Sequence, residues 1–265
     1  MSDRLPGEEY RAGRSSGERT DGPELPLPDD AGPIPRVPRD ASYWAAPVQR
    51  LGAVSDAARS RGLEGKRLMG PQQGFGQLWQ RNYRVPLPGV DLSAAQVVGE
   101  WKARFGEFWP SGGSFHAPLA GIAPGELAAL DVGVGQLVLL STGVFVLYAD
   151  ETSFTFMTPQ GHMFTAWITF AAEEDGGTRT AEVSMLLRAA DPVAEVAYLL
   201  GAARMEDRFW IATLTNLAAA LGAERRPVVT RITCVDRRRQ WRRWTNLRHN
   251  GGPRTLIHGF RAPRG

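Results

Sequence analysis

Residues 191–222 constrain the fold most, because they have the pattern of one long helix. The segment begins with Asp191 and Pro192, contains no further proline, and ends at Gly222. Aspartate caps a first helical turn, proline fits the first helical position, and glycine commonly follows the last one. Apolar residues recur between them in three- and four-residue steps, at Val193, Val196, Leu200, Ala203, Trp210, Leu214, Leu217 and Leu221. Such a helix would span roughly 45 Å, so it requires a large apolar surface to pack against.

The segments before this helix supply that surface as strands. Alternating or continuous apolar runs predict strands at residues 78–85, 126–134, 137–149, 153–158, 164–172 and 178–188, and a further one at 228–235. Short turns join most of them, which makes neighbouring strands antiparallel. A helix capped at Asp91 or Ser93 extends to about Phe108, and residues 110–125 form a glycine- and proline-rich loop. The order predicts an α+β domain in which a curved antiparallel sheet wraps around the long helix.

The flanking segments differ from this domain in composition. Residues 1–40 contain seven prolines, five glycines and fifteen charged side chains, so they predict a disordered arm. Residues 41–75 predict a short helix and a linker, anchored on the domain by Tyr43 and Trp44. The domain itself is predicted over residues 76–222, followed by a basic extension over residues 223–265.

The net charge of +3 hides a strong asymmetry along the chain. Residues 225–265 hold twelve arginines and one acid, whereas residues 1–224 hold nineteen Lys and Arg against twenty-seven Asp and Glu. Arginine interleaved with tryptophan suits contact with nucleic acid or with an anionic membrane surface. Alternatively, Trp241, Trp244 and Leu247 pack on the domain while the arginines pair with its acids. The residues concerned are Arg237, Arg238, Arg239, Trp241, Arg242, Arg243 and Trp244.

Several classes of protein are disfavoured by what the sequence lacks. One cysteine excludes an internal disulfide framework, and no apolar run has the length of a signal peptide or a membrane span. A cytoplasmic location is therefore expected. No phosphate-binding loop, dinucleotide fingerprint or metal-ligand spacing is present, so neither a cofactor nor a metal is expected. The oligomeric state has no signature.

The predicted element order resembles the helix-grip fold of the START-like, or polyketide-cyclase and Bet v-like (SRPBCC), superfamily over about residues 76–222. Four local strings look more specific: GFGQLW at 74–79, YADE at 148–151, FTFMTPQGH at 154–162 and EDRFW at 206–210. They resemble an uncharacterised bacterial, actinobacterial family of START-like proteins. The resemblance implies a largely apolar cavity between sheet and helix that holds a lipid, a polyketide or another hydrophobic molecule. It brings no activity and no catalytic residue.

Asp207 is the only charged residue in the apolar register of the long helix. A buried carboxylate must be paired, hydrogen-bonded or protonated. One interpretation places Asp207 inside the cavity, where it orients a ligand or moves a proton. The other places it at the rim, paired with Arg204, Arg208 or Arg188. Gly201, one turn and a half earlier, marks a kink or a close approach of sheet and ligand.

His162 follows a Pro-Gln-Gly turn and has no histidine at metal-ligand spacing. It acts either as an acid or base, or simply as a turn histidine that bonds to the backbone. The leading hypothesis is binding of a hydrophobic small molecule without chemistry. The alternatives are an aromatase/cyclase-like enzyme that uses Asp207 or His162, and a nucleic-acid or membrane adaptor that works through the basic extension. The predicted ligand-lining residues are Trp101, Phe105, Phe145, Phe156, Trp167, Gly201, Asp207, Trp210 and Leu214.

Overall fold

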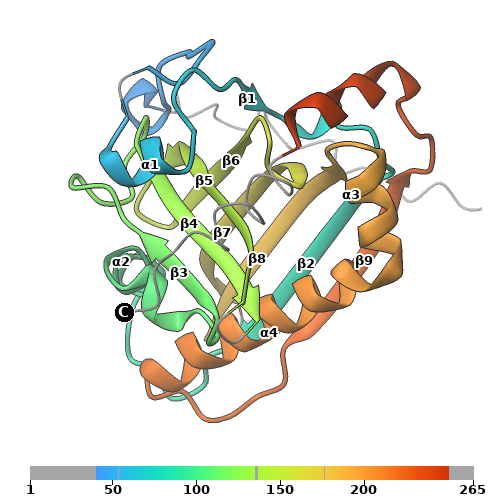
Figure 1. The fold of residues 1–265 in the computed structure, drawn as a ribbon. Coiled ribbons are helices and arrows are strands. Elements are labelled where there is room, and N and C mark those ends of the chain that lie inside the picture. Colours follow the sequence, from blue (N-terminus) through green and yellow to red (C-terminus); the bar gives the residue numbers. More distant parts are fainter. Residues whose placement is uncertain (1–39, 53, 135–136, 176, 251–265) are drawn as a thin grey trace, which may run out of the picture. The chain divides into compact units, whose positions relative to one another are not determined.

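The computed structural model describes residues 40–52, 54–134, 137–175 and 177–250, so the predicted disordered arm lies almost wholly outside the described residues. Its main element is an antiparallel sheet with the strand order β3-β4-β5-β6-β7-β8-β2-β9, and β1 pairs with β6 beside it (Figure 1). The strands are β1 (Leu68–Met69), β2 (Leu78–Pro86), β3 (Gly113–His116), β4 (Leu127–Val134), β5 (Leu137–Ala149), β6 (Ser153–Pro159), β7 (Phe164–Asp175), β8 (Thr178–Ala189) and β9 (Val229–Asp236).

Each strand predicted from the sequence is present within a few residues of its expected bounds. The alternation that predicted β2 has a direct structural cause, because Tyr83 and Val85 face the helices while Arg84, between them, faces away. Hairpins join β4 to β8 in chain order, and every pair is antiparallel. Two strands were missed: β3 forms inside the segment predicted as a long loop, and the short β1 forms inside the predicted helix and linker.

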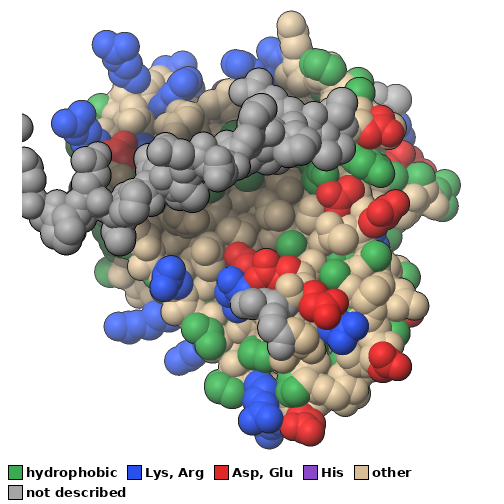
Figure 2. All heavy atoms as spheres, turned by 180° about the vertical axis from the view of Figure 1, so that it is seen from behind, with side chains coloured by type: hydrophobic (Ala, Val, Ile, Leu, Met, Phe, Trp, Pro, Cys, Tyr) green, Lys and Arg blue, Asp and Glu red, His purple; other side chains and the backbone are tan. Residues whose placement is uncertain are grey.

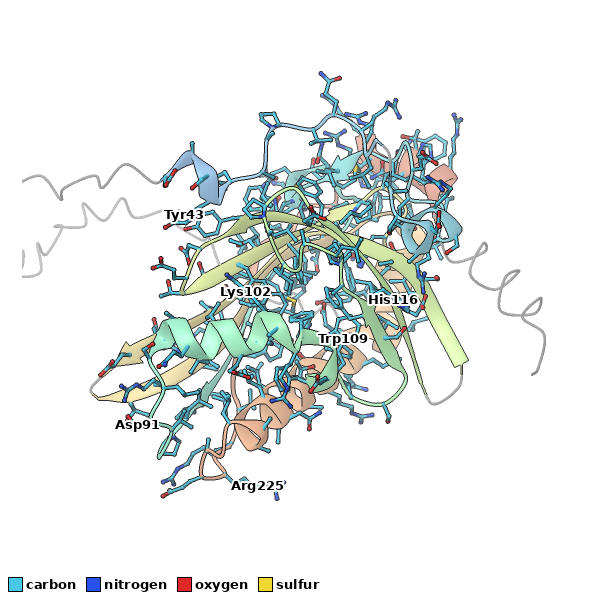
Figure 3. The ribbon with its side chains drawn as sticks, turned by 90° about the vertical axis from the view of Figure 1, so that its left-hand side faces the viewer. Tyr43, Asp91, Lys102, Trp109, His116 and Arg225 are labelled. Atoms are coloured by element: carbon cyan, nitrogen blue, oxygen red, sulfur yellow. The ribbon has the colours of Figure 1, made fainter. Side chains whose placement is uncertain are left out.

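Two helical segments pack on one face of the sheet. The first is α2 (Ala94–Ala103), which Ser93 and Gln96 begin with a reciprocal capping box and which a 3₁₀ turn, η3 (Phe105–Phe108), continues. The second is the long helical region that ends in α4 (Ala203–Ala220). α2 packs on β7 and α4 packs on β2 and β8, so in Figure 3 both lie below the arching strands. This arrangement confirms the predicted α+β helix-grip architecture.

The sequence predicted one continuous helix over residues 191–222, but the structure divides it into three parts. Asp191 caps α3 (Pro192–Ala197) through bonds from the Val193 and Ala194 amides, and one π-helical turn, η4 (Tyr198–Ala202), leads into α4. Gly201 within that turn has φ of 143°, which is a non-helical, left-handed conformation that favours glycine. A side chain built at Gly201 would meet no atom within 4 Å, so the kink and not a close approach explains this glycine.

The kink also corrects the predicted apolar stripe. Beyond it, Trp210, Leu214 and Leu217 are buried against the sheet, as expected. Before it, the three positions expected in the same stripe are exposed instead: Val193, Val196 and Leu200. The buried residues of α3 and η4 are Ala194, Glu195 and Tyr198. The periodicity was therefore correct for α4 and wrong for the turns before it.

The core consists of two clusters on opposite faces of the sheet. The larger fills the space between the sheet and the helices and contains most of the aromatic residues. The smaller lies on the other face, where Leu51, Ala58 and Leu63 of the N-terminal segment cover Phe145. In that segment the expected helix is limited to η1 (Ala41–Tyr43) and the short α1 (Asp56–Ser60).

The basic extension joins the sheet rather than leaving it. Its strand β9 pairs with β2 and forms an edge of the sheet. The buried Arg188 of β8 then holds the following backbone, since its guanidinium donates to Asp236 Oδ2 at 2.6 Å and to the Arg238 carbonyl at 2.9 Å. After β9 the chain forms a 3₁₀ helix, η5 (Trp241–His249), whose Asn246 donates a hydrogen bond to the Gln73 carbonyl in a further 3₁₀ turn, η2 (Pro71–Gln73).

Candidate functional site

A buried polar cluster lies between β2 and the start of α4, in the middle of an otherwise apolar interface. Arg81 of β2 is almost fully buried, and its Nη1 donates to Asp207 Oδ1 at 2.8 Å and to Glu206 Oε2 at 3.3 Å. The Tyr83 hydroxyl donates to the same Asp207 oxygen at 2.6 Å. The Arg81 guanidinium also lies over the ring of Tyr198, 5.3 Å from its centroid. One strand and both sides of the Gly201 kink therefore contribute to this cluster.

Asp207 is thus paired, as one interpretation of the sequence required, but its partners differ from those expected. Arg204 and Arg208 are exposed, and Arg188 pairs with Asp236. The side chain of Asp207 is 26% exposed and that of Glu206 is 11% exposed. The cluster therefore lies at the edge of the interface between β2 and α4, with Asp207 on its solvent side.

The electrostatics of the cluster favour the neutral form of Glu206. Burial raises the pKa of Glu206 to about 7; the charge of Arg81 opposes this rise and that of Asp207 adds to it. Burial also raises the pKa values of Tyr83 and Tyr198, so both remain protonated. Near neutral pH the cluster consequently holds one carboxyl group that exchanges its proton readily beside a carboxylate–guanidinium pair.

Several buried donors on this side of the sheet have no hydrogen bond of normal geometry to a described residue. They are Arg81 Nε, Trp101 Nε1, Trp109 Nε1 and the hydroxyl of Tyr198. Buried polar groups are normally satisfied by protein, water or ligand. The Tyr198 hydroxyl still interacts with Glu206 and lowers the pKa of that carboxyl group, so Arg81, Trp101 and Trp109 hold the three donors with no partner among the described residues.

The aromatic residues around the cluster form one connected set. The ring of Phe105 contacts those of Phe154, Phe156 and Phe170 at centroid distances of 5.0–5.7 Å. Trp101 and Trp210 both contact Phe170, at 5.3 and 5.5 Å. Of the residues expected to line a ligand site, the structure brings together in the large core cluster Trp101, Phe105, Phe156, Trp210 and Leu214, and places Asp207 at its edge.

Two of the expected lining residues lie elsewhere. Phe145 faces the opposite side of the sheet, in the small core cluster, because its neighbours Val144 and Val146 take the inward positions of β5. Trp167 is 43% exposed, while Ala166 beside it is buried in the large cluster. Neither residue belongs to the interface between sheet and helix, because alternation along a strand turns it to the other face.

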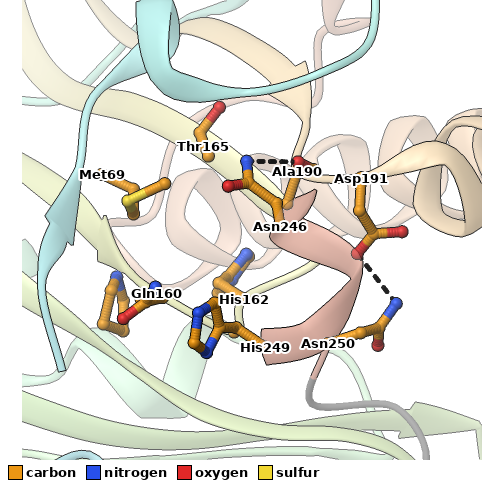
Figure 4. Close-up of a pocket in the computed structure, with 11 residues that line it drawn as sticks. Met69, Gln160, His162, Thr165, Ala190, Asp191, Asn246, His249 and Asn250 are labelled. Atoms are coloured by element: carbon orange, nitrogen blue, oxygen red, sulfur yellow. Dashed lines mark hydrogen bonds between the residues drawn. The ribbon is translucent and has the colours of Figure 1, made fainter. Parts of the chain in front are cut away.

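His162 lies in a separate, small pocket of about 10 Å³, which has room for about one water molecule (Figure 4). Its Nδ1 accepts a hydrogen bond from the Phe164 amide at 3.0 Å, which is the contact expected of a turn histidine. Burial lowers the pKa of His162 to about 4, so the ring is neutral at physiological pH. Asn246 and Asn250 close the pocket through bonds to Ala190 and Asp191. His162 and Asp207 are therefore not parts of one site.

A second polar cluster involves serine, histidine and aspartate but lacks the geometry of a catalytic triad. Asp131 of β4 accepts hydrogen bonds from Arg61, Ser141 and Ser114. His116 Nε2 is 3.4 Å from Ser114 Oγ, yet the same nitrogen is 2.9 Å from Arg61 Nη2, a donor. A nitrogen occupied by a guanidinium donor cannot remove a proton from the serine. The cluster ties the residue that follows α1, Arg61, to β3 and β4.

Arg81, Tyr83, Tyr198 and Glu206 were missed by the sequence analysis. A signal was present in β2, because Trp79, Arg81, Tyr83 and Val85 alternate and Arg81 is the one charged residue in that inward register. Among the described residues no group of acidic, histidine and cysteine side chains has the arrangement of a metal site. None of the helices in the described ranges combines the length and apolar character that a membrane span requires.

Comparisons with known proteins do not assign this chain to a family. No protein-family model matches the chain, and no curated protein matches its sequence. Among solved structures, the di-domain ARO/CYC StfQ from the steffimycin biosynthetic pathway is 9% identical with a TM-score of 0.42, over 54% of this chain and 50% of that one. Ara h 8.0201 is 9% identical with a TM-score of 0.39, over 54% and 97% of the two chains.

A third similar structure is protein Ms6760 from Mycobacterium smegmatis, which is 10% identical with a TM-score of 0.38, over 56% of this chain and 93% of that one. Identities and scores at this level carry no argument about function. The helix-grip assignment rests on the sheet order and on the position of α4 across β2 and β8.

Proposed function

We propose that this protein binds a hydrophobic small molecule, such as a lipid or a polyketide-like compound, between its sheet and its long helix. The observation that supports this most is the set of three buried donors, at Arg81, Trp101 and Trp109, that have no hydrogen-bond partner among the described residues and lie beside a connected set of aromatic rings. Ligand sites are typically apolar with a few polar groups that fix orientation. This combination occurs on the side of the sheet that faces α2 and α4.

The cluster also restricts the polar part of the ligand. Asp207 and Glu206 already accompany the charge of Arg81, so a free anion would gain little there. A neutral oxygen, in a carbonyl, ester or hydroxyl group, would accept from Arg81 Nε or Tyr198. The protonated form of Glu206 is a further donor near pH 7. We therefore expect neutral, oxygen-bearing hydrophobic molecules to bind better than simple fatty-acid anions.

A displacement assay with a solvatochromic lipid probe tests this proposal. Trp210→Ala removes a buried ring next to Phe170, whereas Trp167→Ala removes an exposed ring on the opposite face and serves as the matched control. Tyr198→Phe and Arg84→Gln form a second pair, since Arg84 lies on β2 but faces away from the helices. We expect weaker binding in Trp210→Ala and Tyr198→Phe only. Absence of any ligand by probe and by native mass spectrometry, or equal losses in the controls, would contradict the proposal.

Acid–base catalysis at the same cluster is a second candidate function. It is supported by Glu206, whose pKa of about 7 beside Tyr83 and Asp207 suits a group that both donates and accepts a proton. An aromatase/cyclase-like reaction on the bound molecule would then depend on Glu206 and Asp207, and not on His162. Turnover that keeps its rate in His162→Asn but disappears in Asp207→Asn would favour this candidate. Unchanged ligand after prolonged incubation with the protein would remove it.

We also propose that the basic extension contacts a polyanion. Trp241 is 70% exposed, and Arg237, Arg242 and Arg243 are exposed without an ion pair to a described residue. The alternative, in which the extension packs on the domain and its arginines pair with acids there, is supported by the edge-on contact of Trp241 with Phe75 and by the ion pair of Arg239 with Glu195. Binding to heparin that weakens steeply with salt and is lost in Arg242→Gln/Arg243→Gln is the expected result. Salt-independent binding would contradict it.

A further inference from the structure

One region of the surface exposes an unusual number of large apolar side chains. Leu200 is 83% exposed and Leu199 58%, although both are central in the helical region before α4. Exposed apolar groups that gather in one place mark sites of interaction. The apolar–basic surface is defined by the exposed apolar residues Val193, Val196, Leu199, Leu200, Met205, Trp241, Trp244 and Leu247, with the arginines described below.

Direct contacts hold its two parts, the α3–η4 region and η5, beside each other. Arg239 Nε donates to Glu195 Oε1 at 3.0 Å, and Asn246 Nδ2 donates to the Ala190 carbonyl at 2.8 Å. Asn250 bonds to Asp191 at the start of α3. Figure 1 accordingly shows η5 next to α3. The exposed tryptophans of η5 and the exposed aliphatic residues of α3 and η4 thus belong to one region.

The charges around these apolar residues have one sign. Arg204 and Arg208 flank Met205 on α4, and Arg242, Arg243 and Arg248 lie on η5; all five are exposed and form no ion pair with a described residue. The acids of the same elements are turned inward: Asp191 and Glu195 are buried, and Glu206 and Asp207 accompany Arg81. Figure 2 shows how basic and acidic side chains are distributed over one face of the molecule.

Aliphatic groups, tryptophan and arginine together match the interface of an anionic bilayer. Aliphatic side chains enter the boundary of the acyl chains, tryptophan prefers the level of the headgroups, and arginine pairs with anionic lipids. A nucleic acid would use Trp241 and the arginines for stacking and phosphate contacts, but it would leave Leu199 and Leu200 unused. A second copy placed by two-fold symmetry would bring arginines opposite arginines.

We propose that the apolar–basic surface docks on membranes that contain anionic lipids. This inference rests on the proposed polyanion contact of η5 and names the polyanion as a lipid bilayer. It requires no ligand in the site between sheet and helix. The kinked helical region would lie against the membrane with Leu199 and Leu200 inserted, while α4 beyond Trp210 stays packed on the sheet.

Sedimentation with vesicles tests the docking with the full chain. One set of vesicles contains phosphatidylcholine alone and the other contains about a third phosphatidylglycerol. Leu199→Ser/Leu200→Ser changes only exposed side chains, and Leu119→Ser, a fully exposed leucine in a distant loop, is its control. Arg242→Gln/Arg243→Gln removes two charges from the surface, and Arg225→Gln/Arg226→Gln removes two charges beyond the end of α4.

We expect binding to the anionic vesicles only. The Arg242/Arg243 pair should weaken it at least tenfold, since each arginine near the surface contributes about fivefold. The Leu199/Leu200 pair should weaken it as strongly, with both controls unchanged. Equal binding to neutral and anionic vesicles would overturn the proposal. So would a loss of binding in the control variants as large as the loss in the Leu199/Leu200 and Arg242/Arg243 pairs.

Two further outcomes separate this inference from the proposed polyanion contact. If heparin or single-stranded RNA binds, vesicles do not, and Leu199→Ser/Leu200→Ser has no effect, the docking on membranes is refuted and the polyanion contact survives. If light scattering shows a dimer that Leu199→Ser/Leu200→Ser dissociates, a second copy covers the surface and the membrane proposal is wrong.

Discussion

Glu206→Gln is the most informative single substitution, because it tests the electrostatics of the buried cluster without removing its shape. Burial raises the pKa of Glu206 from an ordinary 4.5 to about 7 in the folded protein. Below pH 4.5 the carboxyl group is protonated in both the folded and the unfolded state and contributes no pH dependence. Between pH 4.5 and 7 the unfolded chain releases the proton while the folded protein keeps it, so the stability of the wild type falls as the pH rises.

The size of this effect follows from the two pKa values. The interval from 4.5 to about 7 corresponds to about 3 kcal/mol of unfolding free energy. Glutamine at position 206 has no titrating proton, so this loss disappears in the variant. Relative to the wild type, Glu206→Gln should gain about 3 kcal/mol between pH 4 and pH 8, whatever constant offset the lost contact with Arg81 adds.

Urea unfolding followed by tryptophan fluorescence, at several pH values between 4 and 8, measures the difference. Glu100→Gln, at a half-exposed position on α2, controls for the loss of one carboxyl group from the protein. Because other titrating groups are common to both proteins, they cancel in the comparison. A difference in stability that stays constant across this range, or that changes in the opposite direction, would refute the account of the cluster.

Four further substitutions test other parts of the structure. Arg188→Met should lower the free energy of unfolding by about 3 kcal/mol and expose η5 to limited proteolysis, because it leaves Asp236 and two carbonyls unpaired; resistance of η5 to protease would argue against this role. Trp101→Ala should cost about 3–5 kcal/mol in chemical denaturation, as for other buried tryptophans, and a loss below 1 kcal/mol would mean that the core is not packed there. Burial lowers the pKa of His162 to about 4, so the stability from its neutral ring is present above pH 6.5 and is lost as the pH falls toward 4. In His162→Asn the free energy of unfolding should therefore fall less between pH 6.5 and pH 4 than in the wild type. An equal fall in both proteins would disprove this role. Gly201→Ala should lower the melting temperature by several degrees, because φ of 143° strains alanine, whereas a stabilised variant would show that the kink straightens at little cost.

Local patterns predicted the secondary structure of this protein well, for physical reasons that act within a few residues. Asp191 and Ser93 cap helices because their side chains accept bonds from the amides that follow them. Gly222 ends α4 with φ of 75°, where glycine is favoured. The short turns between β4 and β8 forced an antiparallel meander, and the helix-grip architecture followed from placing α4 after it.

Features that depend on distant parts of the chain were not predicted. The pairing of β9 with β2 joins segments about 150 residues apart, so no local pattern reports it. Phe145 and Trp167 were assigned to the ligand site by residue type alone, although only the register of the sheet decides which face they take. Arg81 was overlooked because its partners, Glu206 and Asp207, come from the far end of the sequence. Asp207 was recognised because a charged residue among the apolar positions of one helix is visible from the local sequence alone.

The kink at Gly201 connects the two sites that we propose. Before the kink, the helical region buries a different face, since Glu195 and Tyr198 face the protein while Leu199 and Leu200 face outward. A straight helix in the register of α4 would turn Leu200 toward the sheet, which would remove an apolar residue from the surface. One residue with a left-handed backbone thus allows the same helix to place the Tyr198 hydroxyl beside Arg81 and to leave its aliphatic side chains exposed. For this reason a substitution that straightens the helix should weaken ligand binding and membrane docking together, whereas changes at Arg81 or at Leu200 should separate them.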